Sequence, residues 1–219
     1  MNDGSSTTQT VNVEFKGTAL PFFGRGLLLV IAEFLIIPLP WAAAALYRWI
    51  IGNLSLSDGT QVRFNGKGGE VWAPFMVAAV LGYVSFIPFP LVPLLMMFVV
   101  AWLWIIIIRW IVRNVSLSCG TALSFEGTYW QYVGWSLLVG ISVLTIIGWA
   151  WATAAMLRWF WRNVKGGNHV AEFTGSGGEI LWRSLVTLAC CIFIIPIPWI
   201  TWWLFKWYME KVTIQKAVV

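Results

Sequence analysis

The segment Trp102–Asn114, WLWIIIIRWIVRN, recurs with the same spacing at three other places in the chain. Each copy reads Trp, six residues, Arg or Lys, Trp, three residues, and then Asn or Lys. The other copies are Trp41–Asn53 (WAAAALYRWIIGN), Trp151–Asn163 (WATAAMLRWFWRN) and Trp199–Lys211 (WITWWLFKWYMEK). Self-similarity of this kind is typical of a chain built from one repeated supersecondary unit.

An aromatic-x-Gly motif precedes each copy and marks where the repeat begins. The four motifs are Phe15-Lys-Gly17, Phe64-Asn-Gly66, Phe125-Glu-Gly127 and Phe173-Thr-Gly175. The phenylalanine lies 26 residues before the first tryptophan in copies one, three and four, and 38 residues before it in copy two. Copy two therefore carries an insertion of twelve residues. We predict pseudo-repeats over residues 11–56, 60–117, 121–166 and 170–215.

Short alternating segments separate these units and indicate β-strands. Leu54–Phe64 alternates apolar and polar residues around Asp58-Gly59, a pair that favours a tight hairpin turn, and Val115–Phe125 repeats this pattern. Each end of the chain carries half of such a hairpin. Val11–Phe15 resembles the second strand of a hairpin, and residues 211–214 resemble the first strand. We therefore predict that residues 11–15 pair with residues 211–215, so that N- and C-terminal strands close a ring.

Each repeat contains two apolar segments with a break between them. The breaks are Pro38-Leu-Pro40, Pro88-Phe-Pro90, Gly148-Trp149 and Pro196-Ile-Pro198. Proline removes an amide donor and clashes with the preceding turn, so a helix stops there. We predict a repeat of helix A, break and helix B, joined to the next repeat by a β-hairpin.

The composition favours a membrane protein. Hydrophobic residues make up 59% of the chain and charged residues 11%, against about 25% charged residues in a soluble domain. The stretch Val71–Ile108 contains no charged residue, and about 20 apolar residues suffice to cross a bilayer. We predict one membrane domain over residues 1–219, α-helical with a small β component and with membrane lipid as a partner.

The distribution of cations predicts the orientation of this domain. Arg and Lys flank the hairpin segments, whereas the breaks carry no charge, so the positive-inside rule places the hairpins and both termini in the cytoplasm. Helix B measures only about 18 Å from its first tryptophan to its final Asn or Lys, against about 30 Å of hydrocarbon. Full crossing and re-entrant insertion of the helix pairs both remain open.

These motifs together resemble the YjgN-like proteins, a bacterial inner-membrane family described as a domain of unknown function. The resemblance rests on Pro-Trp at the start of helix B, the following cation, Asn at the helix end, a short strand with a glycine turn, and Phe-x-Gly. It covers residues 11–214 and implies a multi-pass protein of the bacterial inner membrane. It implies no activity.

Four basic residues occupy one position in the repeat: Arg48, Arg109, Arg158 and Lys206. If the repeats surround an axis, these cations lie at one depth, and a ring of this kind selects anions. The simpler interpretation is that each long side chain extends to lipid phosphates and anchors its helix. The adjacent tryptophans fit an interfacial anchor as well. They are Trp49, Trp110, Trp159 and Trp207.

Glu33 is the one acid within an apolar helix A, and a carboxylate inside a membrane is costly. Glu33 and Arg48 are seven and eight residues from Pro40 on opposite arms of the first repeat. We predict a structural ion pair between them, with proton or ion handling as the alternative.

Catalytic and cofactor chemistry has almost no candidates in this sequence. His169 is the single histidine, so bis-histidine haem ligation within one chain is excluded. We recognise no catalytic set, metal cluster or nucleic-acid-binding run, and expect no cofactor. Two hypotheses remain. The favoured one is a non-enzymatic scaffold or accessory subunit that organises lipid or a larger membrane complex, through self-association or a membrane-protein partner. The alternative is a channel or transporter for small anions or solutes that uses the basic ring.

Overall fold

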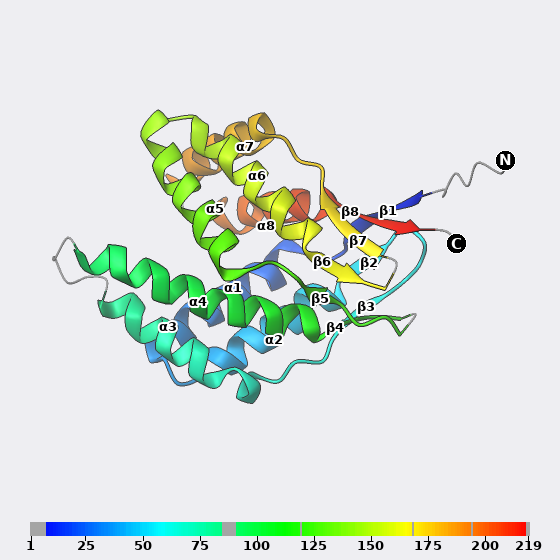
Figure 1. Ribbon diagram of the computed structural model, residues 1–219, viewed down its shortest axis with the longest axis horizontal. Helices are drawn as coiled ribbons and strands as arrows, with labels where there is room; N and C mark the ends of the chain where they lie inside the picture. The colour runs from blue at the N-terminus through cyan, green and yellow to red at the C-terminus, as the bar shows by residue number, and fades with distance from the viewer. Residues whose placement is uncertain (1–7, 85–90, 119, 168, 194, 218–219) are drawn as a thin grey trace.

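The computed structural model describes residues 8–84, 91–118, 120–167, 169–193 and 195–217. Within these residues, helices α1 to α8 project as hairpins from a region of short strands. Both chain ends lie at the strand side of the molecule (Figure 1). The predicted break at residues 88–90 lies outside the described residues. The others lie where helices end: Pro38 and Pro196 precede α2 and α8, and Ile146, with a φ of 66°, comes just before α6.

Each repeat runs strand, helix, helix, strand. The first comprises β1 (Thr8–Phe15), α1 (Ala19–Leu35), α2 (Leu39–Gly52) and β2 (Leu54–Leu56). The second comprises β3 (Val62–Phe64), η1 (Gly68–Glu70), α3 (Trp72–Val84), α4 (Leu91–Arg113) and β4 (Val115–Leu117). The third comprises β5 (Ser124–Phe125), α5 (Tyr129–Ser142), η2 (Val143–Thr145), α6 (Gly148–Arg162) and β6 (Val164–Gly166). The fourth comprises β7 (His169–Phe173), α7 (Gly177–Cys191), α8 (Ile197–Glu210) and β8 (Val212–Ala217).

The two strands of a repeat pair with each other in one register. The phenylalanine of the Phe-x-Gly motif lies opposite the residue that follows the final Asn or Lys of helix B. The four pairs are Phe15 with Leu54, Phe64 with Val115, Phe125 with Val164, and Phe173 with Val212. Antiparallel pairing of this kind holds the two ends of every helical hairpin together.

Strands of neighbouring repeats also pair, and because the last repeat pairs with the first, the four repeats form a closed ring. Strand β1 pairs with β8, so the terminal strands meet as predicted, but the pairing covers residues 8–12 and 213–217 instead of the predicted 11–15 and 211–215. Strand β6 pairs with β7. The other two junctions have single bridges, Ser55 with Gln61 and Ser116 with Ala122. The predicted inter-repeat hairpins are therefore shorter at these junctions than the alternation of Leu54–Phe64 and Val115–Phe125 indicated, because most of the ladder forms within a repeat.

The prediction of a multi-pass membrane domain, and with it the multi-pass inner-membrane location, is wrong. Among the described residues, only one helix is long and apolar enough to cross a membrane, over Met96–Arg113, and 33% of that window is buried in the protein. The other α-helices have 13 to 17 residues, fewer than the roughly 20 that a span needs. Some of the apolar residues form two interior clusters, one around Phe64 and Trp110 and one around Phe173 and Trp207, whereas others stay exposed.

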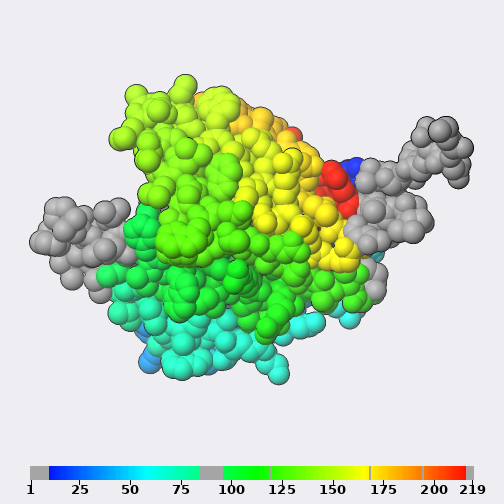
Figure 2. Space-filling view, viewed as in Figure 1, coloured from blue at the N-terminus to red at the C-terminus, as the bar shows by residue number. Residues whose placement is uncertain are grey.

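The helical hairpins pack side by side around these clusters. Helix α4 contacts α5, and α1 contacts α8, so the first and last repeats also meet. Figure 2 shows the third repeat lying directly against the second on one face of the molecule. Hydropathy alone gave the wrong class because a leucine that faces another repeat and a leucine that faces lipid score the same.

Candidate functional site

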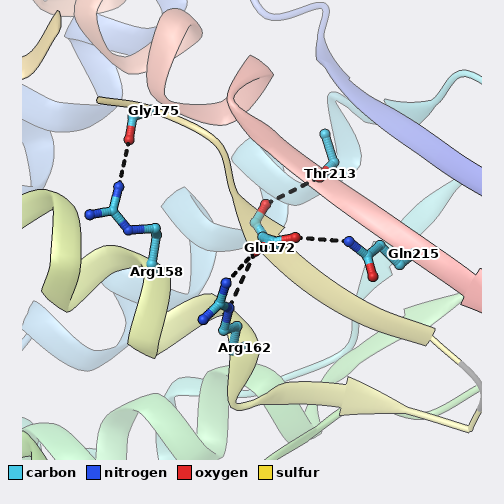
Figure 3. A network of polar contacts seen from close by, with 6 residues as sticks. All are labelled: Arg158, Arg162, Glu172, Gly175, Thr213 and Gln215. Carbon is cyan, nitrogen blue, oxygen red and sulfur yellow. Dashed lines mark hydrogen bonds and ion pairs between the residues drawn. The ribbon is translucent and has the colours of Figure 1, made fainter. Parts of the chain in front are cut away.

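Three of the four predicted basic residues join neighbouring repeats. The guanidinium of Arg48 donates a hydrogen bond to the carbonyl oxygen of Gly66 at 3.0 Å. Arg109 donates to the oxygen of Gly127 at 3.2 Å, and Arg158 donates to that of Gly175 at 3.3 Å (Figure 3). In every case the acceptor is the glycine of the next Phe-x-Gly motif. The cations therefore lie at separate junctions, and each satisfies a backbone carbonyl where a strand ends.

The fourth junction, between the last repeat and the first, is built differently. Lys206 occupies the equivalent position, but the acceptor Gly17 receives its hydrogen bond from the indole of Trp202 at 2.7 Å. The ammonium of Lys206 lies 3.7 Å from the carboxylate of Glu210 and 5.3 Å from the centre of the Trp202 ring. At this junction the indole of Trp202 therefore makes the hydrogen bond that an arginine makes at the other three, and Lys206 contacts Glu210 and Trp202 of its own helix.

The predicted anchor tryptophans lie against the strand ends. Each packs edge-on against the phenylalanine of its own repeat, with ring centroids 5.3 to 6.3 Å apart and planes 82° to 88° apart. Trp110 and Trp207 are buried, whereas Trp49 and Trp159 are half-buried. For Trp110 and Trp207 this interior packing replaces the expected interfacial position.

The predicted ion pair between Glu33 and Arg48 is absent. The side chain of Glu33 is exposed, and the ion pairs found among the described residues do not include it. Arg48 is turned toward the next repeat, where Gly66 accepts its hydrogen bond. Similar distances from Pro40 along the chain did not place the two charges on facing sides of the hairpin.

Glu172 links α6 of the third repeat to β7 and β8 of the fourth (Figure 3). Its carboxylate accepts from Arg162 at 2.6 Å and from the amide of Gln215 at 2.8 Å, and its carbonyl oxygen accepts from Thr213 at 3.4 Å. Exposed ion pairs contribute little stability, and the register of β8 on β7 is given by their five backbone-paired positions, so this network adds side-chain contacts beside that ladder. Sequence reasoning did not find Glu172 because its partners are 10 and 43 residues away.

Arg183 is a second residue that sequence reasoning missed. Its guanidinium carbon lies 4.9, 4.3 and 4.7 Å from the ring centres of Trp182, Trp203 and Trp207. Burial lowers the pKa of this guanidinium, although the charges of Glu179 and Glu210 oppose that effect. The cation is stabilised by the faces of the indole rings. A signal existed, since Arg25 and Arg183 both lie ten residues after the phenylalanine of their motif, and Arg25 also lies over a tryptophan, Trp49.

The centre of the strand ring contains a partly open apolar cavity of about 250 Å³. All four repeats line it through the same three positions. The first position lies two residues before the motif phenylalanine and holds Val13, Val62, Leu123 and Ala171. The second directly follows the final Asn or Lys of helix B and holds Leu54, Val115, Val164 and Val212. The third lies two residues before that Asn or Lys and holds Ile51, Val112, Trp161 and Met209. The lining of this cavity does not include the four basic residues of the repeat, Arg48, Arg109, Arg158 and Lys206.

The outer ends of the helical hairpins carry many exposed large apolar side chains. On the first, third and fourth hairpins, six large apolar side chains that are between 67% and 83% exposed flank the breaks: Phe34, Ile37, Leu144, Ile146, Phe193 and Ile195. The lysines, arginines and most acids lie toward the strand end of the repeats, as at Arg48 and Glu172. We define the hairpin tips as residues 27–41, 137–151 and 185–199. They contain one charged residue, Glu33.

Known proteins offer no further guide to this site. Neither a family model nor a curated protein nor a solved structure matches the chain. The resemblance to the YjgN-like proteins therefore stays a prediction. In the part of the chain that the structure describes, no three His, Cys, Asp or Glu side chains form a group able to hold a metal ion.

Proposed function

We propose that this protein is a non-enzymatic scaffold that binds membrane lipid through its hairpin tips. The observation that carries this proposal is the concentration of exposed apolar side chains at the tips, where Leu144 and Ile195 are each 83% exposed. Large exposed apolar patches mark interaction surfaces, since water solvates them poorly.

The dimensions suit immersion in one leaflet. Helices of 13 to 17 residues are roughly 20 to 26 Å long, whereas one leaflet contributes about 15 Å of hydrocarbon. With the tips in the leaflet, the strand ring and both chain ends stay on the side from which the protein binds. The net charge of +5 adds attraction to anionic headgroups.

The alternative of an anion channel has less support. Arg48, Arg109 and Arg158 each bind a backbone carbonyl at a different junction, and the space on the axis is lined by apolar side chains. A conducting pathway needs polar groups that replace the hydration shell of the ion. The scaffold therefore accounts for more of the structure.

Flotation with vesicles tests the proposal. The wild-type protein should float with vesicles of phosphatidylcholine and phosphatidylglycerol. The double variant Leu144→Glu/Ile195→Glu should bind at least about tenfold more weakly, because burying carboxylates in hydrocarbon costs several kcal/mol. The matched control is Ala122→Glu, which adds a carboxylate to an exposed position at the strand end.

Two results would contradict lipid binding by the tips. One is a wild-type protein that stays with the soluble fraction at low and high vesicle concentration. The other is a double variant that floats like the wild type. If light scattering instead shows that the tip substitutions dissociate an oligomer without changing flotation, the tips bind a second copy of the chain.

A further inference from the structure

The fourth repeat contributes a smaller side chain to the lining of the central cavity than the other three repeats do. The position two residues before the motif phenylalanine holds Val13, Val62 and Leu123 in the first three repeats, but Ala171 in the fourth. All four side chains face the cavity. Alanine is the smallest of them, so the ring has less side-chain volume on this side than its own repeat pattern would supply.

The lining offers a ligand almost no polar partner. Its polar side-chain groups are those of Tyr47, Trp161 and His169, and two of these are engaged elsewhere: the Trp161 indole donates to Tyr208 at 3.0 Å, and Nδ1 of His169 lies 3.2 Å from the carbonyl oxygen of Gly166. Burial raises the pKa of the Tyr47 hydroxyl, in accord with apolar surroundings. A water molecule needs two to four polar partners to be stable in a cavity.

We propose that this cavity binds a hydrocarbon chain. A closed apolar cavity of about 150 Å³ takes up benzene or xenon, and the partly open apolar space here is larger, at about 250 Å³. An alkyl segment fills such a space with dispersion contacts and loses no hydrogen bond on entering. The inference is independent of lipid binding by the tips, because the cavity lies in the strand ring. The chain comes either from a free fatty acid or from a phospholipid.

The variant Ala171→Leu tests most directly whether the cavity binds an alkyl chain. It places in the fourth repeat the residue that the third repeat carries at Leu123, so the ring should tolerate it. The added methyl and methylene groups occupy part of the cavity, and octanoate measured by calorimetry should bind about tenfold more weakly. Ala171→Phe should abolish binding. Ala122→Phe, at an exposed position at the strand end and outside the hairpin tips, is the control and should bind octanoate like the wild type.

Two further measurements keep the test decisive. Crystals of the wild-type protein under xenon should show anomalous density inside the ring, which requires no variant. Short-chain dioctanoyl phosphatidylcholine, used below its micelle concentration, distinguishes the sources. If Ala171→Leu weakens octanoate and phospholipid binding alike, lipid acyl chains enter; if it weakens only octanoate binding, the ligand is a free chain. Absence of xenon density in the ring, or unchanged octanoate binding in both Ala171 variants, would overturn the proposal.

Discussion

The glycine of each Phe-x-Gly motif lies beneath aromatic rings. A Cβ atom added at Gly66 would lie 2.5 Å from Cζ of Phe64 and 2.7 Å from Cζ2 of Trp110. The same arrangement recurs at Gly17 and Gly127. Because the phenylalanine ring folds back over its own chain, the residue two positions later has no room for a side chain. The motif is therefore a packing requirement.

Replacing Gly66 by alanine should destabilise the protein by about 1–3 kcal/mol, because the Phe64 and Trp110 rings must move and the core becomes overpacked. Urea unfolding measures the change. The control is Gly69→Ala, whose added methyl group meets nothing within 4 Å. Equal stability of the two variants would show that the Phe64 and Trp110 rings can move aside without a cost in stability.

At the scale of the element, helix α7 begins with a complete capping box. The hydroxyl of Ser176 accepts from the backbone amide of Glu179, and the carboxylate of Glu179 accepts from the amide of Ser176 at 3.0 Å. Lys211, at the end of α8, lies 2.8 Å from the same carboxylate. One acidic side chain thus joins the start of α7 to the end of α8.

These contacts make stability depend on pH. The hydrogen bond from Lys211, followed by that from the Ser176 amide, lowers the pKa of Glu179 below its ordinary value of 4.5. The folded form therefore binds this proton less readily than the unfolded chain, so the stabilisation is present above that ordinary value. It should disappear as the pH falls through the lower, folded pKa.

Thermal unfolding between pH 6 and pH 3, in steps of about half a unit, measures the effect. Glu179→Gln should reduce the loss of stability on acidification, and Lys211→Met, which keeps the carboxyl but removes its strongest partner, should reduce it as well. A wild-type slope in Glu179→Gln would refute the role of this carboxylate.

Across the whole molecule, closure of the ring depends on the two ends of the chain. Strands β1 and β8 share five paired positions, and α1 packs against α8. The junction at Asp58-Gly59, by contrast, is an exposed turn with one bridge beside it. The chain ends are therefore one more junction between repeats, equivalent to the internal ones.

A circular permutant tests this equivalence. Joining the present ends with a short glycine-serine linker and opening the chain between Asp58 and Gly59 should keep the melting temperature within about 5 °C of that of the wild type. Opening the chain between Ala154 and Ala155, inside α6, should prevent folding because Ala154 is fully buried. Failure of the Asp58 permutant to fold would mean that β1 and β8 must be free ends.

By itself the sequence determined the helix ends near Pro38, Gly148 and Pro196 and the short strands, because turn and backbone preferences act locally. Its repeat pattern also indicated that the terminal strands meet, although not at which residues. Only the tertiary structure decided what each side chain touches. It turned Arg48 toward Gly66 instead of Glu33, paired the two strands of each repeat, and left a cavity beside Ala171. It also corrected the predicted class of multi-pass membrane protein. Hydropathy measures how poorly water solvates a side chain and does not depend on whether protein or lipid takes the place of the water.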